Sequence, residues 1–209
     1  MEPIHSHRGF TLVELMVVFA IIVTITGIVF SSQSTFNKTL ILANTAYDVA
    51  LTLRSAETYG LGSRVISGLS NTGYGIHFDT GTNTFILFED SSGSSCHTSQ
   101  SSQFGYSSGP DAQPGDCVYT SGSDKNVKTY TLGNNITVSN LYVGNNPASV
   151  TSLDVVFARP NPDPSVRANK STVPVYNSAC IAIYSPQGGT RFVRVASSGE
   201  ITSNAISCP

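Results

Sequence analysis

The sequence predicts an α+β fold in which one long N-terminal helix packs on an antiparallel β-sheet head. Three observations predict it. An apolar run fills residues 10–30, a stretch with helical spacing continues to residue 59, and short strand-like segments separated by turn residues occupy most of the remainder. Because the strands follow the helix instead of alternating with further helices, we expect an antiparallel sheet.

The apolar run is long enough to cross a membrane. From Phe10 to Phe30 nearly every residue is apolar, and Glu14 is the only charge before Lys38. About twenty residues that each rise about 1.5 Å span the roughly 30 Å hydrocarbon core of a bilayer. A secretory signal peptide is disfavoured because no small-residue cleavage site follows Phe30, and a plain signal anchor leaves Glu14 unexplained.

The junction between the basic lead and the apolar run carries a motif. G-F-T-L-V-E, from Gly9 to Glu14, resembles the signature of type IV prepilins. The resemblance implies that a membrane peptidase cleaves between Gly9 and Phe10 and then N-methylates Phe10. Inside a bundle of membrane helices, Glu14 of one subunit can pair with the Phe10 amine of a neighbour, which offsets the cost of burying both charges and sets the axial register.

These features divide the chain into a leader at 1–9, a helix at 10–60 that spans the membrane over 10–30, and an exported β-rich head at 61–209. Gly60 and Gly62 end the helix. Gly27, with the serines that follow it, is the expected point of bending or melting on assembly. The residues expected to recur on the face that packs on the head are Phe36, Leu40, Ala43, Tyr47, Ala50 and Leu53.

The head begins with a predicted β-hairpin. From Tyr74 to Phe78 apolar side chains alternate with less apolar ones, as in a strand. Asp79 to Asn83 supply a turn, and Phe85 to Phe88 form the return strand. A long loop, Ser91 to Lys125, follows and is the candidate for a variable contact surface. Further strands are expected at Val127–Leu132, Ile136–Tyr142, Leu153–Ala158, Ala179–Tyr184 and Arg191–Ala196, with a turn before Ile201. Pro160, Pro162 and Pro164 are expected to break the middle of the head.

The four cysteines all lie after the membrane segment, where an exported domain is oxidised. Three pairings are possible, and we favour Cys96 with Cys117 and Cys180 with Cys208 because each pair is nearest in sequence. The first pair would close the long loop and stabilise the head by roughly 3 kcal/mol. Free thiols and a metal site that includes His97 are the alternatives, although the spacing matches no zinc pattern.

Composition excludes several classes of function. Charged residues are 11% of the chain and the net charge is −2. The chain therefore lacks the excess of basic residues that nucleic-acid-binding proteins usually show. His77 alternates onto the less apolar face of a strand, and no histidine has a catalytic setting. Loop oxygens that could hold calcium lack its usual spacing, so turn and cap roles are favoured for Asp79, Asn83, Asp90, Asp111 and Asp116. We predict no enzyme activity, no cofactor and no resident metal.

Three segments resemble the minor pseudopilin H and FimT-like branch of pilin-like proteins: the helix end L-R-S-A-E-T-Y-G, the hairpin F-I-L-F-E-D and the late strand pair T-R-F-V-R-V-A-S-S-G-E-I. The resemblance implies a structural, minor subunit of a type IV pilus or type II secretion pseudopilus. Its partners would be other pilin or pseudopilin subunits, the prepilin peptidase/methyltransferase, an assembly platform protein with its ATPase, and membrane lipid. A major shaft subunit, or a pilin-anchored module that binds a surface, glycan or DNA, is the alternative.

Overall fold

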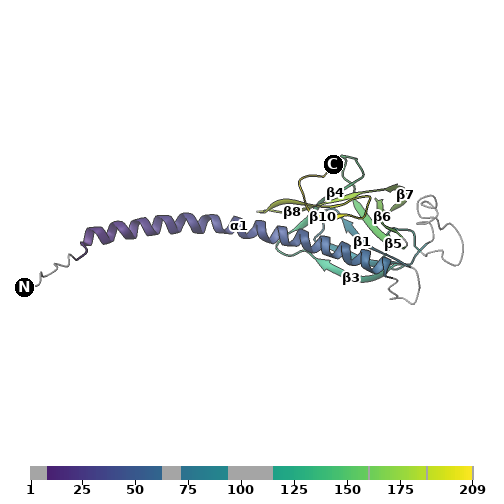
Figure 1. The fold of residues 1–209 in the computed structure, drawn as a ribbon, viewed down its shortest axis with the longest axis horizontal. Helices are drawn as coiled ribbons and strands as arrows, with labels where there is room; N and C mark the ends of the chain where they lie inside the picture. The colour runs from purple at the N-terminus through teal and green to yellow at the C-terminus, as the bar shows by residue number, and fades with distance from the viewer. Residues whose placement is uncertain (1–8, 63–71, 94–114, 160, 187, 209) are drawn as a thin grey trace, which may run out of the picture.

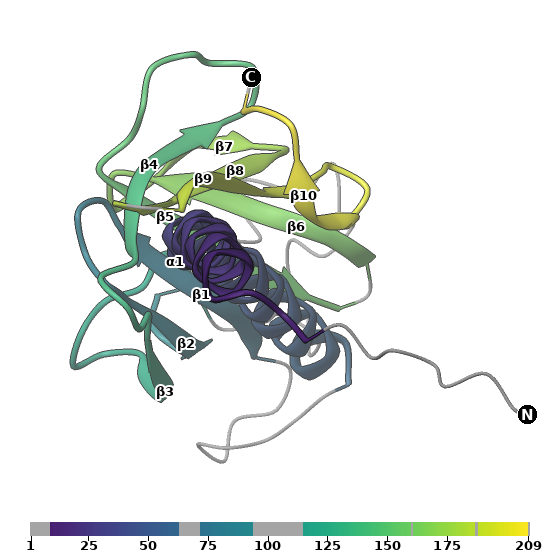
Figure 2. The same cartoon turned by 90° about the vertical axis from the view of Figure 1, so that its left-hand side faces the viewer.

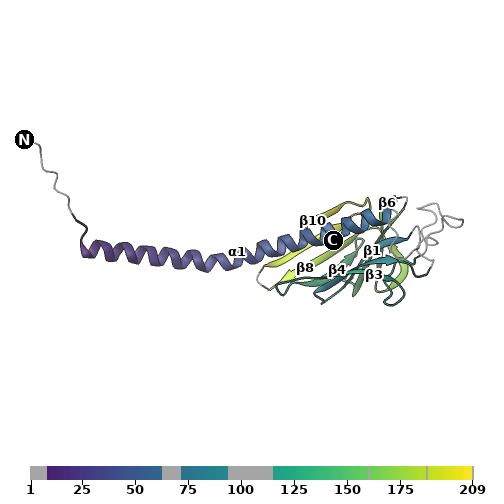
Figure 3. The same ribbon diagram turned by 90° about the horizontal axis from the view of Figure 1, so that it is seen from below.

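The computed structural model describes residues 9–62, 72–93, 115–159, 161–186 and 188–208. Within these ranges the chain forms one helix and ten strands, in the order α1 and then β1 to β10. The helix is far longer than the head, and its first half projects away from it (Figures 1 and 3). The architecture is α+β, as the sequence predicts.

Helix α1 runs from Leu12 to Leu61, 50 residues, which is about 75 Å at 1.5 Å per residue. It passes through Gly27 as one uninterrupted helix. At its C-terminal end the N–H of Gly62 donates to the carbonyl of Thr58 at 2.9 Å. The single long helix expected at about 10–60 is therefore confirmed.

The strands form two antiparallel sheets. The six-stranded sheet, in spatial order β3-β2-β1-β5-β6-β7, is made of β1 Gly73–Asp79, β2 Thr84–Asp90, β3 Lys125–Thr131, β5 Ser152–Ala158, β6 Asn161–Ala168 and β7 Ser171–Tyr176. The four-stranded sheet, in the order β10-β9-β8-β4, is made of β4 Thr137–Val143, β8 Ala179–Ser185, β9 Gly189–Val195 and β10 Ile201–Ala205.

The second half of α1 lies against both sheets, as the view along the helix shows (Figure 2). The helix residues buried in this core are Leu42, Ala46, Val49, Ala50, Leu53 and Ala56. They meet apolar side chains of β1, β5, β8 and β9 such as Phe78, Leu153, Ile181 and Val193. The backbones approach closely at the end of the helix, where a Cβ on Gly60 would collide with the carbonyl oxygen of Phe157.

The predicted packing face of α1 is partly wrong. Ala50 and Leu53 are buried as expected, but Phe36, Leu40 and Tyr47 are 63%, 47% and 61% exposed. This half of the helix is apolar on two opposite faces, so helical spacing alone cannot tell which face the head covers.

The expected hairpin is confirmed, since β1 and β2 pair from Phe78↔Phe85 to Gly73↔Asp90. The expected break at the prolines is wrong, because β6 includes Pro162 and Pro164. In the described part of the chain β7 pairs with β6 only at Val166 and Ala168, and the β5–β6 register shifts between Val156 and Ala158 of β5, opposite residues 161–165 of β6. Proline is tolerated at such one-sided and irregular positions because no ladder hydrogen bond is lost there.

Candidate functional site

The first turn of α1 is closed by Thr11 and Glu14. Thr11 is the N-cap, with extended backbone, and its hydroxyl oxygen accepts the Glu14 N–H at 3.2 Å. In return, Oε2 of Glu14 accepts the Thr11 N–H at 3.3 Å and lies 3.3 Å from the Thr11 hydroxyl. This is a capping box, which satisfies two of the backbone donors that a helix start leaves open. It also places a carboxylate in the first turn, where the helix dipole favours it.

Gly9 and Phe10 precede this turn and are exposed. The Phe10 side chain is 79% exposed. A Cβ on Gly9 would meet no atom within 4 Å, and the backbone there needs no positive φ. The fold of the described chain therefore does not require glycine at this position.

The part of α1 that follows the motif is not covered by the described head. Every described side chain from residue 9 to residue 31 is exposed, and most are large and apolar. In the described part of the chain, α1 is the one helix long and apolar enough to cross a membrane. Uncovered apolar area on this scale needs lipid or protein around it, because water cannot solvate it without a large cost in free energy.

A second apolar surface lies farther along α1, on the side turned away from the head. We call it the outer stripe and define it by Phe36, Leu40, Tyr47 and Leu51, which are 47–63% exposed. Their spacings of four, seven and four residues place them on one helical face. The buried set that includes Leu53 lies on the opposite face, so the head uses one apolar face and leaves the other open.

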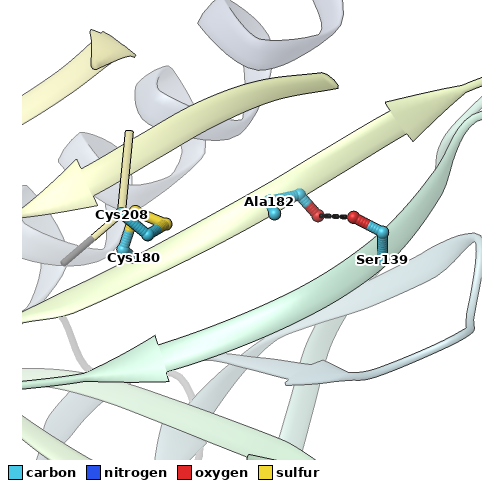
Figure 4. Close-up of a disulfide and its surroundings, with 4 residues drawn as sticks. All are labelled: Ser139, Cys180, Ala182 and Cys208. Atoms are coloured by element: carbon cyan, nitrogen blue, oxygen red, sulfur yellow. Dashed lines mark hydrogen bonds between the residues drawn. A yellow bond between two sulfur atoms is a disulfide. The ribbon is translucent and has the colours of Figure 1, made fainter. Parts of the chain in front are cut away.

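The C-terminal disulfide is present as expected. Cys180 on β8 bonds to Cys208, 28 residues later, and thereby attaches the chain end to the four-stranded sheet (Figure 4). Beside it, the Ser139 hydroxyl of β4 donates to the Ala182 carbonyl at 3.1 Å. Cys117 is also in a disulfide. The proposed pairing with Cys96 falls on a residue outside the described ranges, as do His97 and Asp111.

The sequence did not reveal a buried polar row on the outer face of the six-stranded sheet. His77, Asp154 and Arg167 occupy paired positions on β1, β5 and β6, and they are 3%, 0% and 0% exposed. His77 Nδ1 lies 2.6 Å from Asp154 Oδ1, and Nε2 lies 3.1 Å from Asp79 Oδ2. Polar residues inside apolar strands were a visible signal, but only the strand register shows that they are neighbours.

The chain segment 115–124 covers part of this row, and carboxylates bind its backbone. Asp90 accepts the N–H groups of Asp116 at 3.1 Å and Cys117 at 2.8 Å. Asp154 accepts the Tyr119 N–H at 3.2 Å. Asp124 binds the backbone on both sides, accepting from residues 91, 92 and 120 at 2.7–3.1 Å. Of the loop carboxylates considered for calcium, Asp90 serves as a backbone acceptor, as does Asp116, which accepts the Val118 N–H at 3.0 Å. No metal-type cluster occurs among the described residues.

Burial shifts the pKa values of the charged side chains in and beside this row. Burial alone would lower the pKa of His77, but the hydrogen bonds and negative charges of Asp154 and Asp79 outweigh it and raise that pKa above its usual range. Burial raises the pKa of Asp154 against the opposing effect of His77, and it raises the pKa of Asp90 strongly. Burial also lowers the pKa of the Arg167 guanidinium, which Asp116 and Asp90 partly counteract.

Comparison with known families gives one match. Residues 4–30 match the model of the prokaryotic N-terminal methylation motif. No curated protein and no solved structure matches the chain significantly. The matched segment contains Gly9, Phe10 and the Thr11–Glu14 cap. Together with a long apolar helix and an antiparallel β head stapled by a disulfide, it supports a type IV pilin-like family for this chain and is consistent with a pilin-like fold.

Proposed function

We propose that this chain is a structural subunit of a type IV pilus or of a type II secretion pseudopilus. In this proposal it is inserted once into the cytoplasmic membrane with its head exported, cleaved after Gly9, N-methylated at Phe10 and polymerised through α1. The observation that carries the proposal is a methylation motif joined to a helix whose first half is bare and whose second half keeps the outer stripe open. Such a helix is stable only in lipid or against other helices.

Glu14 acts, in this proposal, between subunits. Cleavage turns the Phe10 N–H into a charged α-amino group one helical turn from Glu14. When the first half of α1 leaves lipid contacts for helix contacts, Glu14 of one subunit pairs with the Phe10 amine of the next. Each charge alone would be costly to bury, so the pair selects one axial register.

We further propose that the subunit is minor, in the pseudopilin H and FimT-like branch, because the helix end and two segments of the head resemble that branch. Its partners are other pilin or pseudopilin subunits, the prepilin peptidase/methyltransferase, the platform protein, the assembly ATPase and membrane lipid. The Cys180–Cys208 disulfide supports an exported head, since such bonds persist in oxidising compartments.

The test is intact-mass spectrometry with subunit quantification on filaments sheared from the native cell surface, alongside the membranes left behind. We expect a chain that begins at N-methylated Phe10 and is present at trace level in the filaments. The same chain dominating the filaments would make it a major subunit, and mature chain confined to the envelope would indicate a pseudopilus. A chain that stays uncut at Met1 in every fraction would refute the proposal.

The matched control is Gly9→Val, because a branched side chain at the cleavage site obstructs an extended backbone in a protease cleft. This variant should accumulate uncut in the membrane. Since a Cβ at Gly9 would meet no atom of the described chain within 4 Å, its head should be as stable as that of the natural chain.

A further inference from the structure

The segment 115–120 lies on the face of the six-stranded sheet that is turned away from α1. Ile76 and Phe78 of β1 belong to the core around the helix, so His77 between them points to the other face. There Cys117 packs with Phe88 and Val156 in a second, smaller apolar cluster. The Tyr119 ring adds to it, with its centroid 5.2 Å from that of Phe88 and 5.0 Å from that of His77.

His77 is held between two carboxylates, one on each ring nitrogen. Asp154 lies 2.6 Å from Nδ1 and Asp79 lies 3.1 Å from Nε2. A neutral imidazole has one N–H and one lone pair, so it can donate to one of these carboxylates only. The charged imidazolium donates to both. The geometry therefore favours the protonated form, in line with the raised pKa of His77.

Asp154 joins the histidine to the covering segment. Its Oδ1 accepts from His77 Nδ1 and also from the backbone N–H of Tyr119, at 2.6 and 3.2 Å. Loss of the His77 proton would leave the fully buried Asp154 carboxylate with at most a neutral donor in place of the imidazolium. A buried carboxylate without a cation beside it is destabilising, so the arrangement of Asp154 and its contact with the Tyr119 N–H would be weakened.

The other charged groups around His77 do not replace this proton. Arg167 on β6 is the cross-strand neighbour of Asp154, but its three guanidinium nitrogens have no hydrogen-bond partner among the described residues. Its charge is offset by Asp116 in the covering segment and Asp90 on β2. Both are carboxyls, and the charged groups that act on His77 itself, Asp154 and Asp79, are carboxyls too, which favours a cation at His77.

The covering segment is also held in a strained conformation. Cys117 has φ 63°, a region that non-glycine residues avoid, and Gly115 has φ 122° beside the Asp90 carboxylate. Strained backbone persists only while the surrounding contacts hold it. The segment therefore depends on its carboxylate anchors, Asp90, Asp124 and Asp154, to keep this conformation.

We propose that His77 is a proton-dependent latch: its imidazolium holds Asp154 in place to bind the Tyr119 N–H, and deprotonation releases residues 115–120 from the outer face of the sheet. The latch is closed in mildly acidic surroundings and opens as the pH rises. Opening exposes the Phe88 and Val156 cluster and changes the surface that the head presents. The proposal does not depend on filament assembly.

The first experiment follows the full chain in detergent micelles by hydrogen exchange, with mass-spectrometric readout of peptides covering 115–124, between about pH 5.5 and about pH 9 on either side of the ordinary histidine pKa. After correction for intrinsic rates, protection of the Tyr119 region should be greatest at the acidic end. It should fall by about tenfold for each unit by which the folded pKa of His77 exceeds that of the opened state. A peptide from β8 should show no such change.

Variants separate the latch from general destabilisation. His77→Gln should remove the pH dependence, while Glu200→Gln, at an exposed turn residue outside the row, should keep it. Asp79→Asn removes the more exposed of the two carboxylates, so it should move the midpoint to lower pH while the segment still closes. If His77→Gln does not fold, the histidine ring resonances of the natural chain report the titration directly. A His77 midpoint at or below about 6.5, or pH-independent protection of 115–120, would overturn the proposal.

Discussion

Thr11 and Glu14 cap each other at the start of α1, with the Glu14 N–H donated to the Thr11 hydroxyl at 3.2 Å and the Thr11 N–H donated to the Glu14 carboxylate at 3.3 Å. The acid that we propose for contacts between subunits therefore already has a role inside its own chain. The two roles are separable, because glutamine also serves at this position of a capping box but carries no charge.

Glu14→Gln should keep the helix start and still fail to enter filaments, as should Glu14→Ala, because both lack the charge that pairs with the Phe10 amine. Membrane insertion and cleavage should be unchanged in both. Thr11→Ala is the control: it weakens the cap by about 1 kcal/mol and keeps the charge, so it should assemble. Immunoblots of sheared filaments and membranes measure the outcome. Normal filament levels of Glu14→Gln would remove the proposed charge pair.

Leu51 and Leu53 offer a matched pair two residues apart on opposite faces of α1. Leu53→Ala should destabilise the head by about 2–5 kcal/mol, since this side chain is fully buried in the core. Leu51→Ala, on the outer stripe, should change head stability by less than about 0.5 kcal/mol and reduce filament incorporation. Denaturant unfolding and filament yield test the two effects. If Leu51→Ala assembles normally, the outer stripe is not a subunit contact.

Gly60→Ala should destabilise the head by roughly 1–3 kcal/mol, because the added methyl group collides with the Phe157 carbonyl of β5. Gly133→Ala is the control, since a Cβ there meets no atom within 4 Å. Urea midpoints compare the two variants. Equal midpoints would mean that the helix end moves away from β5 at little cost.

Removal of the Cys180–Cys208 bond should lower head stability by roughly 3 to 4 kcal/mol, the chain-entropy value for a loop of this length. Cys208→Ser with Cys180→Ser tests this by thermal unfolding, and Ser207→Ala is the control beside it. A double variant as stable as the natural chain would show that the tail contributes no constraint.

The head should lose stability as the pH rises. The pKa values of His77, Asp90, Asp116 and Asp154 are all raised, so the folded head binds more protons than the unfolded chain. The contribution of His77 is complete below about pH 6.5 and is lost as the pH rises through its raised pKa. The contributions of the carboxyls are complete below about pH 3.9 and are likewise lost as the pH rises through their raised values.

This loss of stability can be measured by thermal unfolding, followed by near-ultraviolet circular dichroism, at about pH 5, 6.5 and 8. These pH values bracket the ordinary histidine pKa. The midpoint should be highest at the acidic end. Asp90→Asn, which holds that group in a neutral form, should flatten the profile. An unfolding midpoint that rises steadily with pH would contradict the predicted loss of stability.

Local chemistry made much of this protein readable from its sequence. The motif at Gly9 to Glu14, the apolar run behind it and the length of the helix depend on residues adjacent in the chain. The hairpin of β1 and β2 was readable for the same reason, since its turn residues lie between its strands. Cys180 and Cys208 were paired correctly because their separation is short.

Only the tertiary structure decided which features combine across the chain. Two apolar faces of α1 were equally eligible to pack, and the shape of the two sheets selected the one with Leu53 over the one with Leu51. The strand through Pro162 and Pro164 depended on what lies beside it, because proline disrupts a sheet only where its missing N–H would have been used. His77, Asp154 and Tyr119 are distant in sequence and meet through strand register and a returning segment, so their hydrogen bonds to one another could not be seen before the fold was known.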